Sequence, residues 1–299
     1  MKLYLLRLIL LGSLALLAGC QGSSDRPVMK IGYMNCNSAE ETMERFQPLT
    51  KYLSDKLNVE FQAVPVDTQD FAERFAGGEF EFAHTNSLVY LILHEEQQAT
   101  LLATEKRGNY GSHTAGAIIS KKGSGIKKIE DIKGKRVIFG PQLAPSGYLA
   151  QYDLMLRNGI DPELDIAYYA IPTGSFKHEK VVYSVYFDQF DVAAVPALDL
   201  ELMTRAGKVT ADDFNILGQS PTFPYCTFSA RKDVDADLVK KFRQVLVDLT
   251  EPDTVDYQGE TLKVLASAWI NGFEALADSD YDQLREMAKR ANMPPYQEF

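Results

Sequence analysis

The chain has 299 residues, of which 45% are apolar and 24% are charged, a composition typical of a soluble globular protein with room for two domains. Its formal net charge of -10 argues against nucleic acid as a partner, because no basic stripe is present to neutralise phosphate groups.

The N-terminal segment is predicted to be removed or anchored rather than folded. Two basic residues flank the apolar run 8–19, which is too short for a stable membrane-spanning helix. The run ends in LLAGC, and small residues directly before a cysteine resemble the cleavage site of bacterial lipoproteins. We expect a lipoprotein signal peptide at 1–19, lipidation of Cys20 and a flexible tether at 20–27. The alternative is an ordinary secretory signal with a chance cysteine.

From residue 28 onward, strand-like and helix-like stretches alternate. Ser38 and Glu41 form a capping box, and Asn86 or Ser87 caps a later helix. The predicted strands are 28–34, 59–66, 80–85, 99–107 and 114–122, and the predicted helices are 38–46, 48–57, 68–79 and 86–96. This βα alternation predicts a mostly parallel sheet flanked by helices.

The alternation then restarts, and the chain ends in a mainly helical part. The predicted strands are 135–140, 166–172 and 191–197, and the predicted helices are 125–134, 147–160, 178–190 and 198–207. The last third is predicted to be helical, in the segments 235–250, 261–276 and 280–291. Apolar residues of the first of these segments lie on one helical stripe, which predicts burial of that face.

The two α/β lobes either form independent units or cross, with the second lobe inserted into the first. The strand-like passages 114–122 and 224–232 favour crossing, because each runs between lobes without the composition of a linker. We therefore predict lobe 1 at 28–115 plus 223–299 and lobe 2 at 116–222, joined by a two-stranded hinge. Ligands of open α/β sheets lie at the carboxyl ends of strands, so a ligand cleft between the lobes is expected.

Two cysteines remain if Cys20 is lipidated. Cys36 and Cys226 either form a disulfide, as exported proteins allow, or serve as small buried apolar residues. The sequence leaves both alternatives open.

The sequence gives no indication of catalysis or of a bound metal. It contains no GxSxG, HExxH or P-loop motif, and its four histidines are scattered. We therefore expect a protein that is not an enzyme and that has neither a metal site nor a cofactor.

Five stretches resemble one family of proteins. The run 123–161 resembles the entry to the second lobe of the phosphate-, phosphite- and phosphonate-binding proteins of ABC importers. The segments 46–60, 75–92, 173–195 and 281–288 resemble the same family in the same order. The resemblance implies a type II periplasmic-binding-protein fold, with two α/β lobes, a two-stranded hinge and a ligand cleft.

The resemblance also places a ligand at the start of the helix in 147–160. Family members typically carry Ser-Thr-Ser-Gly there, whereas this chain carries Ala144, Pro145, Ser146 and Gly147, so two hydroxyl donors are missing. Ser146 is the predicted N-cap. The backbone N–H groups that follow it, including those of Gly147 and Tyr148, are predicted anion donors, because the first amides of a helix lack internal partners. The alternative is that Ser146 is only a cap.

The first lobe should supply the opposite wall of the cleft from polar residues at helix starts and in the crossover. Such residues are also common caps or packed aromatics, which is the alternative interpretation. The candidates are Asn35, Thr85, Asn86, Ser87, Tyr90 and Tyr110.

The second lobe offers two further candidates. The family's Gly-Ser-His-Glu sequence stands here as GSFKHE, with two residues inserted before His178. His178 can donate to an anion, more strongly when protonated, unless it is simply a surface residue. Asp199 follows the predicted strand 191–197, and a carboxylate there favours an oxyanion only if the ligand carries a proton or an amine.

These features together predict a monomeric, lipid-anchored receptor in the cell envelope, facing the periplasm or the cell exterior. It would bind a small oxyanion of the phosphonate, phosphite or phosphate class and deliver it to an ABC permease. The alternatives are that the same fold acts as the ligand-binding part of a membrane sensor, with a histidine kinase or cyclase as partner, or that it binds a different small anion.

Overall fold

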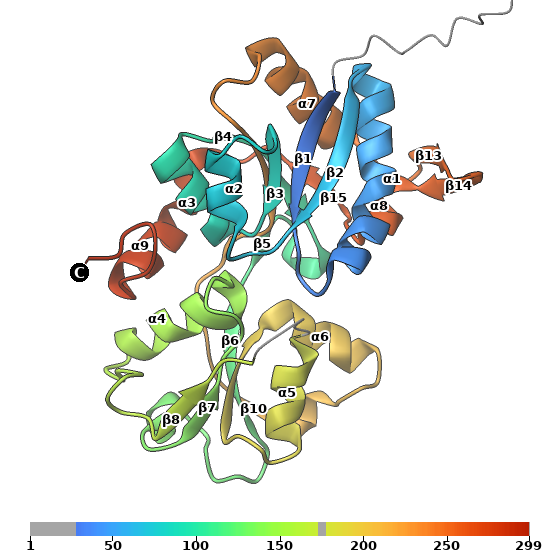
Figure 1. Ribbon diagram of the computed structural model, residues 1–299. Helices are drawn as coiled ribbons and strands as arrows, with labels where there is room; N and C mark the ends of the chain where they lie inside the picture. Colours follow the sequence, from blue (N-terminus) through green and yellow to red (C-terminus); the bar gives the residue numbers. More distant parts are fainter. Residues whose placement is uncertain (1–27, 173–177, 299) are drawn as a thin grey trace, which may run out of the picture.

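The computed structural model describes residues 28–172 and 178–298, which form two α/β lobes, one above the other in Figure 1. The predicted signal peptide 1–19, the tether 20–27 and the lipidation site Cys20 lie outside the described residues. No helix in the described part of the chain combines the length and the apolar character needed to cross a membrane.

The first lobe is built on a six-stranded sheet in the order β15-β4-β12-β3-β1-β2. Its strands are β1 (Val28–Met34), β2 (Glu60–Val66), β3 (Phe82–Thr85), β4 (Thr100–Lys106), β12 (Thr227–Ala230) and β15 (Gly272–Glu274). Strand β1 is parallel to β2 and β3, whereas β12 runs antiparallel to β3 and β4. The C-terminal part of the chain therefore completes a sheet that the N-terminal part begins.

Helices pack on both faces of this sheet. They are α1 (Ala39–Leu57), α2 (Phe71–Ala76), α3 (Ser87–Gln97), α7 (Ala236–Asp248) and α8 (Val264–Ala268). Successive side chains of a strand point to opposite faces, so Phe82 stacks on Phe242 of α7 with ring centroids 4.2 Å apart, while Ala83 joins the core under α2 and α3.

The second lobe is built on a five-stranded sheet in the order β10-β6-β9-β7-β8. Its strands are β6 (Gly116–Lys121), β7 (Arg136–Ile138), β8 (Tyr168–Ala170), β9 (Val192–Pro196) and β10 (Phe214–Gln219). Its helices are α4 (Ala150–Arg157), α5 (Glu179–Tyr186) and α6 (Ala197–Arg205). The three parallel strands β8, β7 and β9 end on the side that faces the first lobe (Figure 1).

Two neighbouring segments connect the lobes. Strand β5 (His113–Thr114) lies between β4 and β6 in the chain, and β11 (Phe223–Pro224) lies between β10 and β12. The two pair as an antiparallel ribbon of their own. The fold is therefore the type II arrangement expected from the sequence, with a two-stranded connection between the lobes.

The C-terminal helix α9 (Asp282–Arg290) also touches both lobes. Its buried Leu284 and Met287 belong to one apolar core with Leu88 of α3 and Met155 of α4. The guanidinium of Arg290 donates from Nε to Oδ1 of Asp153 in α4 over 2.6 Å, and the Asp153 side chain is 1% exposed. Helix α9 thus ties the second lobe to the first beside the connecting ribbon.

Replacing Arg290 with methionine should lower the free energy of unfolding by about 2 kcal/mol, because the buried Asp153 carboxylate loses its charged partner while the apolar stem is kept. Urea unfolding measures the change. Lys289→Met is the matched control on the same helix. Its exposed pair with Glu286, at 3.0 Å, should contribute less than about 0.5 kcal/mol. Equal losses in the two variants would contradict the role given to Asp153.

Most elements lie where the sequence predicts them, and three predictions were wrong. The predicted separate helices 38–46 and 48–57 are one helix, α1, with Pro48 inside it. Proline removes one backbone N–H, so the helix loses the hydrogen bond that this group would donate to the carbonyl of Glu44 in the preceding turn. Segment 125–134 forms only a short 3₁₀ turn at Ile129–Ile132.

The third wrong prediction is the helix at 261–276. This segment is divided between β14 (Glu260–Lys263), α8 and β15, and β14 pairs with β13 (Thr254–Tyr257) as a hairpin. Helix α8 stops because Trp269 adopts a left-handed conformation with φ 61°. Gly272 then has φ 145°, which only glycine adopts readily.

Candidate functional site

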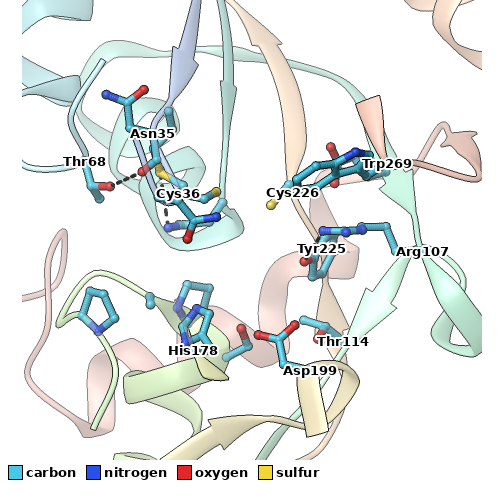
Figure 2. Close-up of a pocket in the computed structure, with 18 of the residues that line it drawn as sticks. Asn35, Cys36, Thr68, Arg107, Thr114, His178, Asp199, Tyr225, Cys226 and Trp269 are labelled. Atoms are coloured by element: carbon cyan, nitrogen blue, oxygen red, sulfur yellow. Dashed lines mark hydrogen bonds between the residues drawn. The ribbon is translucent and has the colours of Figure 1, made fainter. Parts of the chain in front are cut away.

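A cavity of about 410 Å³ lies between the two lobes. Its walls are the segments that follow β1, β3, β4, β7 and β9, joined by His178, Tyr225, Cys226 and Trp269. Figure 2 shows residues from both lobes converging on this space, with His178 and Asp199 opposite Cys36 and Cys226. The cavity is thus at the carboxyl ends of strands, where ligands of open α/β sheets bind.

Six of the residues predicted from the sequence line the cavity, and five do not. The lining residues are Asn35, Asn86, Ser87, Ser146, His178 and Asp199. The residues outside the lining are Thr85, Tyr90, Tyr110, Gly147 and Tyr148.

Asn86 joins the two lobes beside the cavity. Its Oδ1 accepts from the backbone N–H of Val89 at 2.9 Å, which makes Asn86, one of the two predicted caps, the N-cap of α3. Its Nδ2 donates to the backbone carbonyl of Leu143, in the loop after β7, over 2.9 Å. Because both ends of the amide are engaged, Asn86 holds the two lobes together rather than offering donors to a ligand.

Two buried hydroxyls face the cavity without a partner. Ser87, the first residue of α3, is 1% exposed, and Thr114 of β5 is 2% exposed. Neither hydroxyl forms a hydrogen bond within the described part of the chain. Buried polar groups are nearly always paired, so two such groups in one cavity indicate a ligand that accepts hydrogen bonds. Ser87 also begins a helix whose first amides have no acceptor within the helix.

The N-terminal end of helix α4 in the second lobe, with the turn before it, differs from the prediction. Ala144, not Ser146, occupies the N-cap position, and a π turn spans Pro145–Leu149 before α4. The N–H groups of Gly147, Tyr148 and Leu149 all donate to the carbonyl oxygen of Ala144, at 3.3, 2.9 and 3.4 Å. The prediction that these amides lack internal partners was therefore wrong. The Ser146 side chain still lines the cavity.

The space left by the missing side chain of Gly147 is filled by His178. A Cβ atom at position 147 would lie 2.8 Å from Cε1 of the His178 ring, so a larger residue there would force the ring to move. Burial lowers the pKa of His178, although the negative charge of Asp199 opposes the shift. At neutral pH the imidazole is therefore uncharged and can donate one N–H to an anion without adding positive charge.

The three predicted tyrosines are part of the protein core. Tyr90 donates from its hydroxyl to Oδ1 of Asp278 over 2.9 Å. Tyr148 packs against Phe139 with ring centroids 4.9 Å apart, and Tyr110 packs at the edge of the second lobe's core. Thr85 is fully buried in β3 and lies outside the cavity lining.

The positively charged residues of the cavity were not predicted from the sequence. Arg45 of α1 lies between the rings of Phe46 and Trp269, with its guanidinium carbon 4.8 and 4.7 Å from the ring centroids. Arg107 donates to the hydroxyl of Tyr225 over 3.1 Å (Figure 2). Neither arginine belongs to a recognisable motif. Their positions depend on strands and helices that are far apart in the sequence.

A buried, hydrogen-bonded pair of a histidine and a glutamate lies at the base of the cavity. His84 Nε2 and Glu105 Oε1 are 2.9 Å apart, and both side chains are almost fully buried. Burial by itself raises the pKa of Glu105, but His84, Arg107 and Arg45 outweigh it and hold the pKa below its usual value. Glu105 is therefore ionised, and it is hydrogen-bonded to His84.

Both cysteines left open by the sequence line the cavity as free thiols. Cys36 follows β1 and is exposed, and Cys226 precedes β12 and is half-buried. Within the segments 28–172 and 178–298, no cluster of three or more His, Cys, Asp or Glu side chains could hold a metal ion.

Comparisons with known proteins agree with this architecture. Residues 31–281 match the family described as ABC transporter, phosphonate, periplasmic substrate-binding protein. PhnD1 from Prochlorococcus marinus, solved with methylphosphonate, is 16% identical with a TM-score of 0.73, over 89% of this chain and 98% of its own. A binding protein of an ABC phosphonate transporter from Pseudomonas aeruginosa is 19% identical with a TM-score of 0.71, over 90% of this chain and 87% of its own. At such identities these two structures show the fold alone.

A curated relative is similar in sequence over part of its length. The tetrathionate sensor histidine kinase TtrS of Salmonella typhimurium is 30% identical over 221 residues, which are 72% of this chain and 36% of that protein. This chain thus spans about a third of the length of that relative. The matching family and the two structural neighbours are substrate-binding proteins rather than enzymes. Since the family match covers most of its length, the chain belongs to the periplasmic substrate-binding proteins of phosphonate ABC transporters.

Proposed function

We propose that this protein is a receptor that binds one small oxyanion of the phosphonate, phosphite or phosphate class in the cavity and delivers it to an ABC permease. The observation that carries the proposal is the pair of buried, unpartnered hydroxyls of Ser87 and Thr114 in a cavity that also holds Arg45 and Arg107. These groups supply the donors and the positive charge that an oxyanion needs. They replace the two hydroxyls that the family's Ser-Thr-Ser-Gly sequence would provide.

We further propose that the receptor is monomeric and is held at a membrane by lipid on Cys20, after removal of 1–19, with 20–27 as its tether. In this proposal lobe 1 comprises 28–115 plus 223–299 and lobe 2 comprises 116–222. The division is supported by the sheets, because every strand of the larger sheet falls in the first set and every strand of the smaller sheet in the second.

The ligand in this proposal carries a proton or an amine beside its oxyanion. Two acceptors in the cavity support this. The Asp199 carboxylate accepts no hydrogen bond from any described residue. Asn35 donates from Nδ2 to Asp67 Oδ1 over 2.8 Å, which leaves its buried Oδ1 without a donor among the described residues. Acceptors next to an anion are repulsive unless the ligand brings its own hydrogen atoms.

The variant Asp199→Asn tests this proposal because it predicts opposite effects for two ligands. An aminophosphonate should bind about tenfold more weakly, since a charge-assisted hydrogen bond becomes a neutral one. Methylphosphonate at alkaline pH, as a dianion, should bind more tightly, since a like charge is removed. Trp269 is the only tryptophan and lines the cavity, so its fluorescence reports both titrations. A change in the same direction for both ligands would contradict the role of Asp199.

A second candidate ligand class is a sulfur oxyanion of the polythionate type. It is favoured by the likeness to the tetrathionate sensor and by the two free thiols in the cavity. The partner would then be a membrane sensor kinase or cyclase rather than a permease. Native mass spectrometry of the purified protein distinguishes the classes by the mass of the ligand that co-purifies.

A further inference from the structure

Cys36 and Cys226 lie at the same edge of the first sheet, two strands apart. Tyr33 of β1 and Phe228 of β12 are both in register with His84 of β3, the strand between them. Cys36 is three residues beyond Tyr33, and Cys226 is two residues before Phe228 in an antiparallel strand, so both are displaced toward the cavity. Two strand spacings amount to about 10 Å.

This spacing prevents a direct disulfide. The Cα atoms of a disulfide lie about 4.4–6.8 Å apart, so joining the two cysteines would require movement of the backbone. The thiols instead border the space in which a ligand would sit, and Figure 2 shows both of them at the cavity wall.

The surroundings of the thiols attract anions. The charges of Arg45 and Arg107 act on both sulfur atoms, and the opposite charge of Glu105 acts on them as well. The Nδ1 atom of His84 is buried in the cavity lining and has no partner among the described residues. An anion held by the two arginines and by Ser87 and Thr114 therefore lies against the thiols.

We propose that Cys36 is a thiol-exchange site for oxyanions that contain a sulfur–sulfur bond, an inference that rests on the sulfur-oxyanion candidate above. With tetrathionate, the Cys36 thiolate attacks one of the two inner sulfur atoms. A bond forms between Sγ and that sulfur, the central sulfur–sulfur bond breaks, and thiosulfate leaves with the bonding electron pair. The thiol proton passes to solvent, and Cys36 carries an S-thiosulfate group.

Cys36 rather than Cys226 is the attacking residue because it is the more accessible of the two. Burial, and then Glu105 and Cys36, raise the pKa of Cys226 well above its usual value, which keeps it protonated. At about 10 Å, Cys226 cannot displace the second thiosulfate by forming an internal disulfide. The adduct therefore persists until a small thiol reduces it, and its sulfonate occupies the anion site near Arg45.

The rate of the reaction should rise with pH above neutrality, because only the thiolate attacks and the ordinary pKa of a cysteine lies above neutral pH. Arg45 and Arg107 lower the pKa of Cys36, whereas Glu105 and Glu41 raise it. Cys226 also faces Cys36 and stays neutral over the same range.

In the experiment, the purified full chain is treated with tetrathionate and its intact mass is recorded. Peptide mapping then identifies the modified residue, so that any reaction at Cys20 is counted separately. We expect one S-thiosulfate group at Cys36, which is absent in Cys36→Ser and Cys36→Ala and retained in Cys226→Ser. Methylphosphonate at about ten times its dissociation constant should slow the reaction about tenfold, because it fills the same site. Thermal unfolding confirms that each variant is folded.

The possible outcomes separate the two proposals. Modification of Cys226 instead of Cys36, or a rate at Cys36 equal to that of the urea-unfolded chain, overturns the exchange site. Methylphosphonate binding without any adduct overturns it as well and leaves the oxyanion receptor intact. Adduct formation in a protein that binds neither phosphonate nor phosphate supports the exchange site and overturns the phosphonate-class proposal.

Discussion

Replacing Ser146 with aspartate should weaken oxyanion binding about 100- to 1,000-fold while leaving the stability of the protein unchanged. The Ser146 side chain lines the cavity at the second lobe, so the new carboxylate would stand beside the bound anion. Two like charges about 4 Å apart repel by roughly 4 kcal/mol at the effective dielectric of a partly exposed site. The fold uses the backbone of this residue rather than its side chain, since the Ser146 carbonyl accepts from Nε2 of Gln151 at 2.7 Å.

The matched control is Ser146→Asn, which has nearly the same shape as aspartate without its charge. Titration of both variants with methylphosphonate, followed by the fluorescence of Trp269, should show the large loss only for aspartate. Circular dichroism and thermal unfolding should give the wild-type midpoint for both. Equal losses in the two variants would show that bulk rather than charge is responsible, and unchanged affinity in Ser146→Asp would place the anion elsewhere.

Much of the fold follows from short-range patterns in the sequence. The strand at β3 followed by the cap at Asn86 is an example, because a capping side chain accepts from a backbone N–H only three residues further along the chain. The order of strands and helices then predicts mostly parallel sheets and a cleft at the carboxyl ends of their strands. The two sheets are in fact mixed, because strands such as β12 and β6 run antiparallel to their neighbours. This reasoning placed Ser87 and Asp199 in the cavity lining, since each stands at a helix start that closely follows a strand.

The errors arise where a tertiary contact or a single backbone conformation decides the structure. Arg45 stands in the middle of α1, and only the fold brings Trp269 of another segment to stack on it. Thr114 looks like an ordinary strand residue until β5 pairs with β11 and its hydroxyl is left facing the cavity. The π turn at Pro145–Leu149 uses amides that helix rules would leave free. None of these features has a local sequence pattern.

The double variant Ser87→Ala with Thr114→Val should lower oxyanion affinity by about 100-fold or more without destabilising the protein. Each hydroxyl is expected to donate to a charged ligand, and such a hydrogen bond contributes about 1.5–3 kcal/mol. Each single variant should therefore lose about tenfold or more. Because the hydroxyls are buried and unpartnered in the free protein, replacing them with apolar groups of similar shape removes an unfavourable burial. The free energy of unfolding should stay the same or rise.

Thr104→Val is the matched control, because it removes a buried threonine hydroxyl that is satisfied. Thr104 Oγ1 lies 3.2 Å from Thr227 Oγ1 and 2.9 Å from the hydroxyl of Tyr281, and it does not line the cavity. This variant should lose about 1 kcal/mol of stability and keep its affinity for methylphosphonate. The hydroxyls of Ser87 and Thr114 would be assigned to ligand binding if their variants lost affinity but not stability, while Thr104→Val lost stability but not affinity. If the double variant instead lost stability and kept its affinity, Ser87 and Thr114 would be structural, and the donors of the oxyanion would have to come from Arg45, Arg107 and His178.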